Sequence, residues 1–224
     1  MISQSPIVFL SGAGLPEWIW DDIRAALPVD SMVPAYPKED GATLGDYAEA
    51  VRSQVRWPVF TLVAHSAGGV VATELISRVP KRVDGFLAIS ASLPAAGQSF
   101  FSALPFPQKA ILPVIVRMSG TRPPEKVMRS GLANGLDERL VDRIVRDFSP
   151  ESQRFYRDRV GAASYPSRSG YILTHSDREF PVSMQERFRK RLGSGWTRSI
   201  ETGHLPMVQK PAELGGYIRE FIEQ

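Results

Sequence analysis

The 224-residue sequence contains no cysteine, which excludes disulfides, a cysteine nucleophile and thiolate metal sites. A chain without disulfides fits a reducing compartment, and we therefore expect a soluble cytoplasmic protein. Histidine is also scarce, with only three in the chain. A catalytic imidazole, if one is needed, must come from this short list.

Targeting and membrane signals are missing as well. Met1 is followed by Ile-Ser-Gln-Ser-Pro rather than by a basic segment and a long apolar core, so we expect no signal peptide. No apolar run is long enough to span a bilayer. The formal charge is +3, and residues 117–168 hold 11 Lys and Arg against 7 Asp and Glu. This excess is dispersed and lacks interleaved stacking aromatics, so neither nucleic acid nor membrane is an expected partner.

What is present is an alternation of short apolar runs with helical patterns, in a chain of ordinary globular composition. Strands are expected at 7–10, 32–33, 59–64, 83–89, 171–174 and 196–200, and helices at 18–27, 44–55, 70–76 and 183–193 and from 211 onwards. Such alternation predicts a mostly parallel sheet of about six strands flanked by helices, with no N-terminal hairpin. A capping box at 183–186 and a helix start at Ser149-Pro150 are also expected.

The alternation breaks after Ser92, and residues 94–169 contain no convincing strand. We expect a helical lid there, inserted into a core formed by 1–93 and 170–224; the competing interpretation is more helical core. Phe100, Phe101 and Phe106 are its candidate pocket residues. A lid with the positive excess described above would favour acidic substrates.

The chain is organised around Ser66. An apolar strand pattern runs into Ala64-His65-Ser66-Ala67-Gly68, and a helical pattern follows. Small residues two positions either side of the serine permit a very tight turn, which would present a strained hydroxyl beside a helix N-terminus. A serine in an ordinary loop is the alternative interpretation. Ala64 replaces the first glycine of the usual G-x-S-x-G pattern.

A serine hydroxyl needs a base, and that base needs an orienting carboxylate. His204 lies just after the last predicted strand, at the sheet edge where Ser66 is expected. Asp177 lies just past the preceding strand, with Glu179 as a nearby rival. Residues 85–124 contain no Asp or Glu, so the other common position for the acid is empty. We therefore predict a Ser66–Asp177–His204 triad.

An oxyanion hole requires two backbone N–H groups. Ala67, directly after the serine, is expected to supply one, and Ala13 in the loop after the first strand the other. Gly12 and Gly14 flank Ala13 and would allow the backbone to approach a substrate closely.

With these motifs in this order, the sequence resembles the α/β-hydrolase superfamily, and more narrowly the branch of salicylate-type methyl esterases and hydroxynitrile lyases. The resemblance covers Val8–Trp20, Leu62–Gly69, Tyr171–Asp177 and Thr202–Glu213. Ser11 departs from the histidine of many members. The lyases carry a lysine after the catalytic histidine and a threonine in the first loop, whereas Leu205 and Gly12 stand here. The resemblance thus implies hydrolysis, with Gly12 and Leu205 as further pocket positions.

The sequence predicts a serine hydrolase that cleaves a small carboxylic ester through an acyl-enzyme, without metal or organic cofactor. Its expected partner is a small-molecule ester, and a homodimer is a candidate assembly. A thioesterase, a lactonase or a carbon–carbon bond hydrolase with the same triad remains open. So does a ligand receptor or signalling protein built on the same fold, which would bind without turnover.

Overall fold

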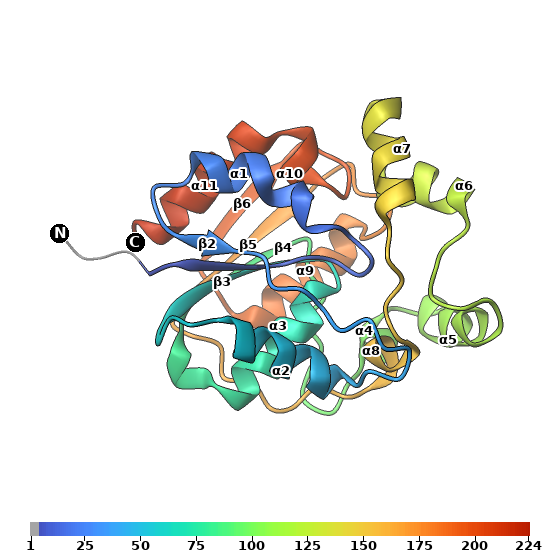
Figure 1. Cartoon of the computed structure of the whole chain (residues 1–224), viewed down its shortest axis with the longest axis horizontal. Helices are drawn as coiled ribbons and strands as arrows, with labels where there is room; N and C mark the ends of the chain where they lie inside the picture. Colours follow the sequence, from blue (N-terminus) through green and yellow to red (C-terminus); the bar gives the residue numbers. More distant parts are fainter. Residues whose placement is uncertain (1–4) are drawn as a thin grey trace.

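The computed structural model describes residues 5–224, whose centre is a six-stranded sheet in the order β2-β1-β3-β4-β5-β6 (Figure 1). Every neighbouring pair of strands is parallel. The strands are β1 Ile7–Leu10, β2 Ser31–Met32, β3 Phe60–His65, β4 Val83–Ile89, β5 Arg168–Thr174 and β6 Trp196–Ile200. The predicted parallel α/β sheet is confirmed, and β1, β4 and β6 have the predicted bounds.

Helices cover both faces of the sheet, which is why its central strands are apolar on both sides. One face packs against α2 Leu44–Gln54, α3 Gly68–Arg78 and α9 Val182–Leu192. The other packs against α1 Asp21–Ala26, which follows the short helix η1 Glu17–Trp20, and against α10 Pro206–Gln209 and α11 Pro211–Ile222. Alternate residues of one strand face opposite layers: Leu62 contacts the first and Val63 the second. A short helix, η2 Pro80–Arg82, precedes β4.

Between β4 and β5, residues 94–167 form helices joined by loops and contain no strand, and we refer to this segment as the helical insert. It holds α4 Phe100–Ala103, α5 Gln108–Ser119, α6 Glu125–Val127, η3 Met128–Leu132, α7 Glu138–Asp147 and α8 Gln153–Arg157. Figure 1 shows α5, α6 and α7 at one end of the sheet, away from the layers that cover its faces. The predicted boundary at 169 overruns the first two residues of β5.

Two predicted helix starts are wrong. Helix α9 follows Pro181 and has no side-chain cap, so the expected capping box at Ser183 does not form. Helix α8 begins at Gln153 rather than after Ser149, because the Ser152 hydroxyl accepts a hydrogen bond from Phe155 N–H at 3.2 Å and caps it there. Among the helices of residues 5–224, none is long and apolar enough to cross a membrane.

Candidate active site

Ser66 lies between the end of β3 and the start of α3, in a backbone conformation that side chains rarely adopt. Its φ is +54°, and its position is fixed by two backbone bonds: Ser66 N–H donates to Ile89 O at 3.2 Å, and Ser92 N–H donates to Ser66 O at 2.9 Å. A Cβ on Gly68 would lie 2.6 Å from the carbonyl oxygens of Leu10 and Ser11. The turn therefore requires a residue without a side chain at 68.

His204 follows β6 and lies beside the serine. His204 Nε2 is 2.8 Å from Ser66 Oγ, and His204 Nδ1 is 2.7 Å from Asp177 Oδ2. All three residues are buried. The structure thus brings together the three side chains that the sequence predicts as a triad.

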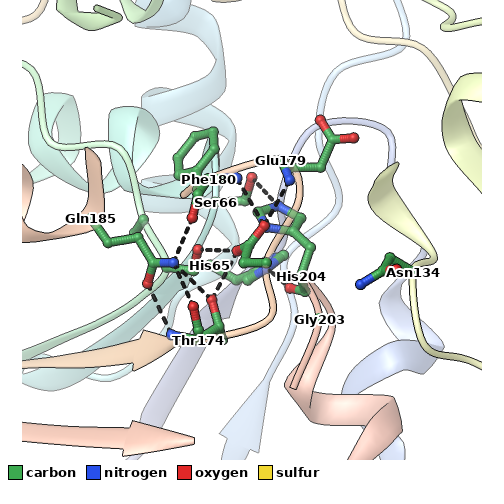
Figure 2. A network of polar contacts seen from close by, with 12 residues as sticks. His65, Ser66, Asn134, Thr174, Glu179, Phe180, Gln185, Gly203 and His204 are labelled. Carbon is green, nitrogen blue, oxygen red and sulfur yellow. Dashed lines mark hydrogen bonds and ion pairs between the residues drawn. The ribbon is translucent and has the colours of Figure 1, made fainter. Parts of the chain in front are cut away.

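Asp177 is held by five donors, and the residues that supply four of them, Thr174, Glu179, Phe180 and His204, are labelled in Figure 2. Its Oδ1 accepts from the backbone N–H groups of Glu179 and Phe180, both at 2.8 Å. Its Oδ2 accepts from Ser90 Oγ at 2.7 Å and Thr174 Oγ1 at 2.8 Å as well as from His204. Burial alone would raise the pKa of Asp177, but the His204 ring and these hydrogen bonds lower it well below its usual range. The carboxylate is therefore ionised and immobile.

The pKa of His204 responds in the opposite direction. Burial favours the neutral ring, yet the charge of Asp177, its hydrogen bond to Nδ1 and the charge of Glu179 together raise the pKa above the usual value. With Asp177 accepting from Nδ1–H, the neutral tautomer leaves the Nε2 lone pair directed at Ser66. That is the arrangement a general base requires.

Sequence reasoning missed the residues that hold this pair in place. Gln185 on α9 is fully buried and bonds Thr174 from both ends of its amide: Oε1 accepts Thr174 N–H at 2.9 Å, and Nε2 donates to Thr174 O at 2.8 Å (Figure 2). Ser90 directly follows β4, at the position where the alternative acid would lie, and it donates to Asp177 Oδ2. The signal available in the sequence was the position of Gln185, three and seven residues before Phe188 and Leu192 and therefore on the apolar side of the predicted helix.

The other two histidines have different surroundings. His65 is buried, and its Nε2–H donates to His204 O at 2.8 Å, so it fixes the backbone of the neighbouring histidine. Burial and the nearby His204 lower the pKa of His65 to about 3, which keeps it neutral. His175 has a side chain 40% exposed, 3.6 Å from Glu201. Within residues 5–224, neither His65 nor His175 forms a hydrogen bond with Ser66 Oγ.

The two expected oxyanion donors, Ala13 and Ala67, both line the cavity beside Ser66. Ala67 immediately precedes α3, whose N-terminus carries partial positive charge. Within residues 5–224, neither amide donates a recorded hydrogen bond to another protein group. Both are thus available to a substrate oxygen.

The loop that carries Ala13 is clamped through Gly14 by the helical insert. Gly14 N–H donates to Glu151 Oε1 at 3.0 Å, and Ser149 N–H donates to Gly14 O at 3.0 Å. Gly14 has a φ of +74°, and a Cβ there would lie 2.1 Å from the Phe148 ring. Tyr47 holds the other oxygen of Glu151, its hydroxyl donating to Oε2 at 2.9 Å. The insert therefore sets the position of the expected oxyanion loop.

A cavity of about 140 Å³ opens at Ser66, between the sheet edge and the helical insert. Its wall is mostly apolar and consists of Ala13, Leu15, Ser66, Ala67, Phe100, Pro123, Val127, Met128, Leu132, Phe148, Tyr156, Glu179, Phe180 and His204.

Of the five predicted pocket residues, only Phe100 lines this cavity. Phe101 is buried behind it against Tyr156, and Phe106 is 76% exposed at the surface. Leu205 belongs to the core beneath α10, and a Cβ at Gly12 would lie only 2.9 Å from Ser66 Cβ. Leu205 and Gly12 were predicted as pocket residues from the comparison with lyases. In the structure neither lines the cavity, because both are packed against neighbouring side chains. Within residues 5–224 no three His, Asp or Glu side chains gather as a metal site would require.

Comparison with known proteins places this geometry in context. Residues 7–215 match the profile of the family described as "Alpha/beta hydrolase family". The fold is similar to an extracellular α/β-hydrolase from a Paenibacillus species, described as sharing structural and functional homology with tobacco salicylic acid binding protein 2. That match has a TM-score of 0.84, 17% identity, and coverage of 96% of this chain and 98% of that one.

Two further structures are similar. A methylesterase from Arabidopsis matches with a TM-score of 0.77 and 16% identity over 98% of this chain and 99% of its own. A pyrethroid hydrolase from Sphingobium faniae matches with a TM-score of 0.75 and 17% identity over 98% and 97%. No curated protein sequence matches significantly. What these solved structures share with the chain is the fold.

Proposed function

The chain belongs to the alpha/beta hydrolase family, and from that premise we propose that it is a serine hydrolase acting on a small carboxylic ester. The observation that carries the proposal is the pair of contacts through His204, 2.8 Å to Ser66 Oγ and 2.7 Å to Asp177 Oδ2. A serine in hydrogen-bond reach of a base that is itself oriented by a carboxylate is the arrangement needed for nucleophilic catalysis.

In acylation, Ser66 Oγ attacks the ester carbonyl carbon as its proton passes to His204 Nε2. The carbonyl oxygen becomes negative and is bound by the N–H groups of Ala13 and Ala67. The tetrahedral intermediate collapses when the bond to the alcohol oxygen breaks and His204 returns the proton to that oxygen. The acyl group stays on Ser66, and the alcohol leaves.

Deacylation repeats these steps with water. His204 takes a proton from water as its oxygen attacks the acyl carbon, and the same oxyanion donors stabilise the second intermediate. Collapse breaks the bond to Ser66 Oγ, which regains its proton from His204. Throughout, Asp177 stays ionised and stabilises the imidazolium.

We propose further that the helical insert is a lid on a core formed by the chain up to residue 93 and from 170 to 224. It supplies half of the cavity wall, including Phe100, Phe148 and Tyr156, while Ser66 and His204 come from the core. The core thereby supplies the reacting groups, and the insert supplies much of the apolar wall that a substrate would contact.

Hydrolysis is favoured over cyanohydrin cleavage by the charge of the cavity. Departing cyanide needs a cation, but the residue after His204 is the buried Leu205, and the charged side chain that lines the cavity is Glu179. A carboxylate would repel the leaving anion.

The test is turnover of p-nitrophenyl acetate and butyrate by the wild type and by Ser66→Ala, together with cyanide release from mandelonitrile. We expect ester hydrolysis by the wild type, near-background rates for Ser66→Ala and no catalysed cyanide release. Tight binding of esters without turnover would favour a receptor instead. Hydrolysis unchanged in Ser66→Ala would contradict the proposal.

A further inference from the structure

The cavity beside Ser66 contains a carboxylate that the proposed reaction does not use. Glu179 follows Asp177 by two residues, and its backbone N–H is committed to Asp177 Oδ1 at 2.8 Å. Its side chain points away from the triad, as Figure 2 shows, and lines the cavity. Of the described residues in the cavity wall, Glu179 alone carries a formal charge.

Within residues 5–224, the Glu179 carboxylate has neither a recorded hydrogen bond nor an ion pair. It faces η3, where a Cβ on Gly131 would meet Glu179 Oε1. Glu179 is exposed to solvent, yet the neighbouring protein displaces enough water from its carboxylate to raise its pKa above the usual value. A carboxylate in such a place gains most from a ligand that carries the opposite charge.

The positive groups of the helical insert do not neutralise this carboxylate. Arg129 is committed to Glu125, Glu138 and Asp142, and Arg122 donates to the carbonyl oxygens of Phe148 and Val145. No lysine or arginine of residues 117–168 lines the cavity. The formal charge in the cavity wall is therefore negative, whereas the composition led us to expect a preference for acidic substrates.

The rest of the wall suits a cation equally well. Phe100, Phe148, Tyr156 and Phe180 all line the cavity, with the rings of Phe100 and Tyr156 5.5 Å apart and those of Phe100 and Phe180 6.3 Å apart. Aromatic faces attract ammonium groups, and the attraction is stronger where water is excluded. A carboxylate at one side of an aromatic wall is the combination that holds a substituted ammonium ion.

We propose that Glu179 is a specificity-determining residue that selects esters carrying an ammonium group, with the aromatic wall of the cavity receiving its alkyl substituents. The inference rests on the proposed ester hydrolysis and adds the substrate class. Esters with a carboxylate in the same place would be rejected, because two anions would share an apolar cavity.

The test uses two pairs of substrates whose members differ only in charge, measured at pH 8, on the alkaline side of the ordinary range of a carboxyl group. One pair is p-nitrophenyl 4-(trimethylammonio)butanoate and p-nitrophenyl 5,5-dimethylhexanoate, with the charge on the acyl side. The other is acetylthiocholine and S-(3,3-dimethylbutyl) thioacetate, with the charge on the leaving group. We expect the wild type to prefer the cationic member of one pair by about tenfold in kcat/KM.

Glu179→Gln should bring that ratio to about one, and because the ratio is taken within one enzyme, any general effect on chemistry cancels. Glu49→Gln, which removes the same charge from exposed α2, should keep the wild-type ratio. A wild-type ratio at or below one in both pairs, or a ratio unaffected by Glu179→Gln, would overturn the inference. If the wild type hydrolysed neither the neutral ester nor the neutral thioester, that result would instead count against the proposed hydrolysis.

A binding measurement tests the inference even if the wild type hydrolyses none of these substrates. Titration of benzyltrimethylammonium into the wild type and Glu179→Gln, followed by protein NMR, should show about tenfold weaker binding to the variant. Equal binding to the two proteins would overturn the inference independently of turnover.

Discussion

Replacing Asp177 with asparagine changes one atom, and the hydrogen bonds around it determine the consequence. The Oδ1 position faces two backbone N–H groups, from Glu179 and Phe180. These donors cannot rotate, so an amide nitrogen placed there would leave both unpaired, at a cost of about 1–3 kcal/mol each. The asparagine oxygen must therefore occupy the Oδ1 position, and its nitrogen the Oδ2 position.

At the Oδ2 position the amide nitrogen faces His204 Nδ1 and the hydroxyls of Ser90 and Thr174. The hydroxyls can turn to accept from it. His204 can accept at Nδ1 only if its proton moves to Nε2, and Nε2 then has no lone pair for the Ser66 proton. The fold is preserved, but the base is in the wrong tautomer.

We therefore expect Asp177→Asn to lower kcat for p-nitrophenyl butyrate about 10⁴-fold, as the same substitution does in a serine protease. That factor corresponds to about 5 kcal/mol of transition-state stabilisation. The assay is initial-rate kinetics at saturating ester, with circular dichroism to verify folding and Glu179→Gln as the neighbouring control. A folded Asp177→Asn with more than about a tenth of wild-type kcat would refute the reasoning, as would a larger loss in the control.

Three further predictions concern the cavity, the oxyanion loop and pH. Phe100→Ala removes an apolar side chain from the cavity wall and should raise KM for p-nitrophenyl hexanoate about tenfold. Phe106→Ala changes a residue that is 76% exposed and should leave this KM unchanged. Equal effects of the two substitutions would contradict the position of the cavity. Glu151→Ala frees Gly14 N–H and should lower kcat by about 10–100-fold with a smaller change in KM, because a loosened donor costs less than a lost one. Tyr47→Phe removes the bonds of the Tyr47 hydroxyl to Glu151 Oε2 and to Ser152 N–H but keeps the bond from Gly14 N–H to Glu151, so it should have a smaller effect. His204 must be neutral to act as a base, so kcat/KM for a neutral ester should fall as the pH drops below the raised pKa of His204. The charge of Glu179 contributes to that raised pKa, so Glu179→Gln should move the acidic limb of the pH profile to lower pH. An acidic limb that stays in place or moves to higher pH would show that Glu179 does not act on His204.

The sheet and the meeting of Ser66, Asp177 and His204 could be predicted because both depend on local signals and one geometric rule. Short apolar runs mark buried parallel strands, and the carboxyl ends of those strands meet at one edge. Residues just after β3, β5 and β6 therefore had to lie close together. The tight turn at Ser66 was visible in Ala64 and Gly68 alone.

The cavity could not be predicted, because a helical insert has no such rule. Phe100 and Phe106 are both aromatic residues among prolines, yet one lines the cavity and the other is 76% exposed. The direction in which each side chain points depends on how the short helices of the insert pack. A helix of four residues, such as α4, is too short for its hydrophobic periodicity to predict this. Charge composition misled in the same way, since the insert is positive overall while the charged side chain in the cavity wall is Glu179.

The supporting residues were hidden for a different reason. Gln185 and Ser90 are polar side chains whose partners are far apart in the sequence, with Ser90 and Asp177 separated by 87 positions. Gln185 lies inside the stretch 183–186 that was predicted as a capping box, between its capping residues Ser183 and Glu186, and that local pattern gave it no role. Only the packing of α9 against β5 shows that its amide instead fixes Thr174.

The central claim is that Ser66 is a nucleophile activated by His204, and covalent labelling tests it most directly. A fluorophosphonate probe reacts when a serine oxygen attacks phosphorus and fluoride leaves, so it reports activation without knowledge of the natural ester. The account predicts one adduct per chain, located at Ser66 by peptide mass spectrometry, absent in Ser66→Ala and strongly slowed in Asp177→Asn. An adduct at another residue, or labelling that persists in Ser66→Ala, would contradict it.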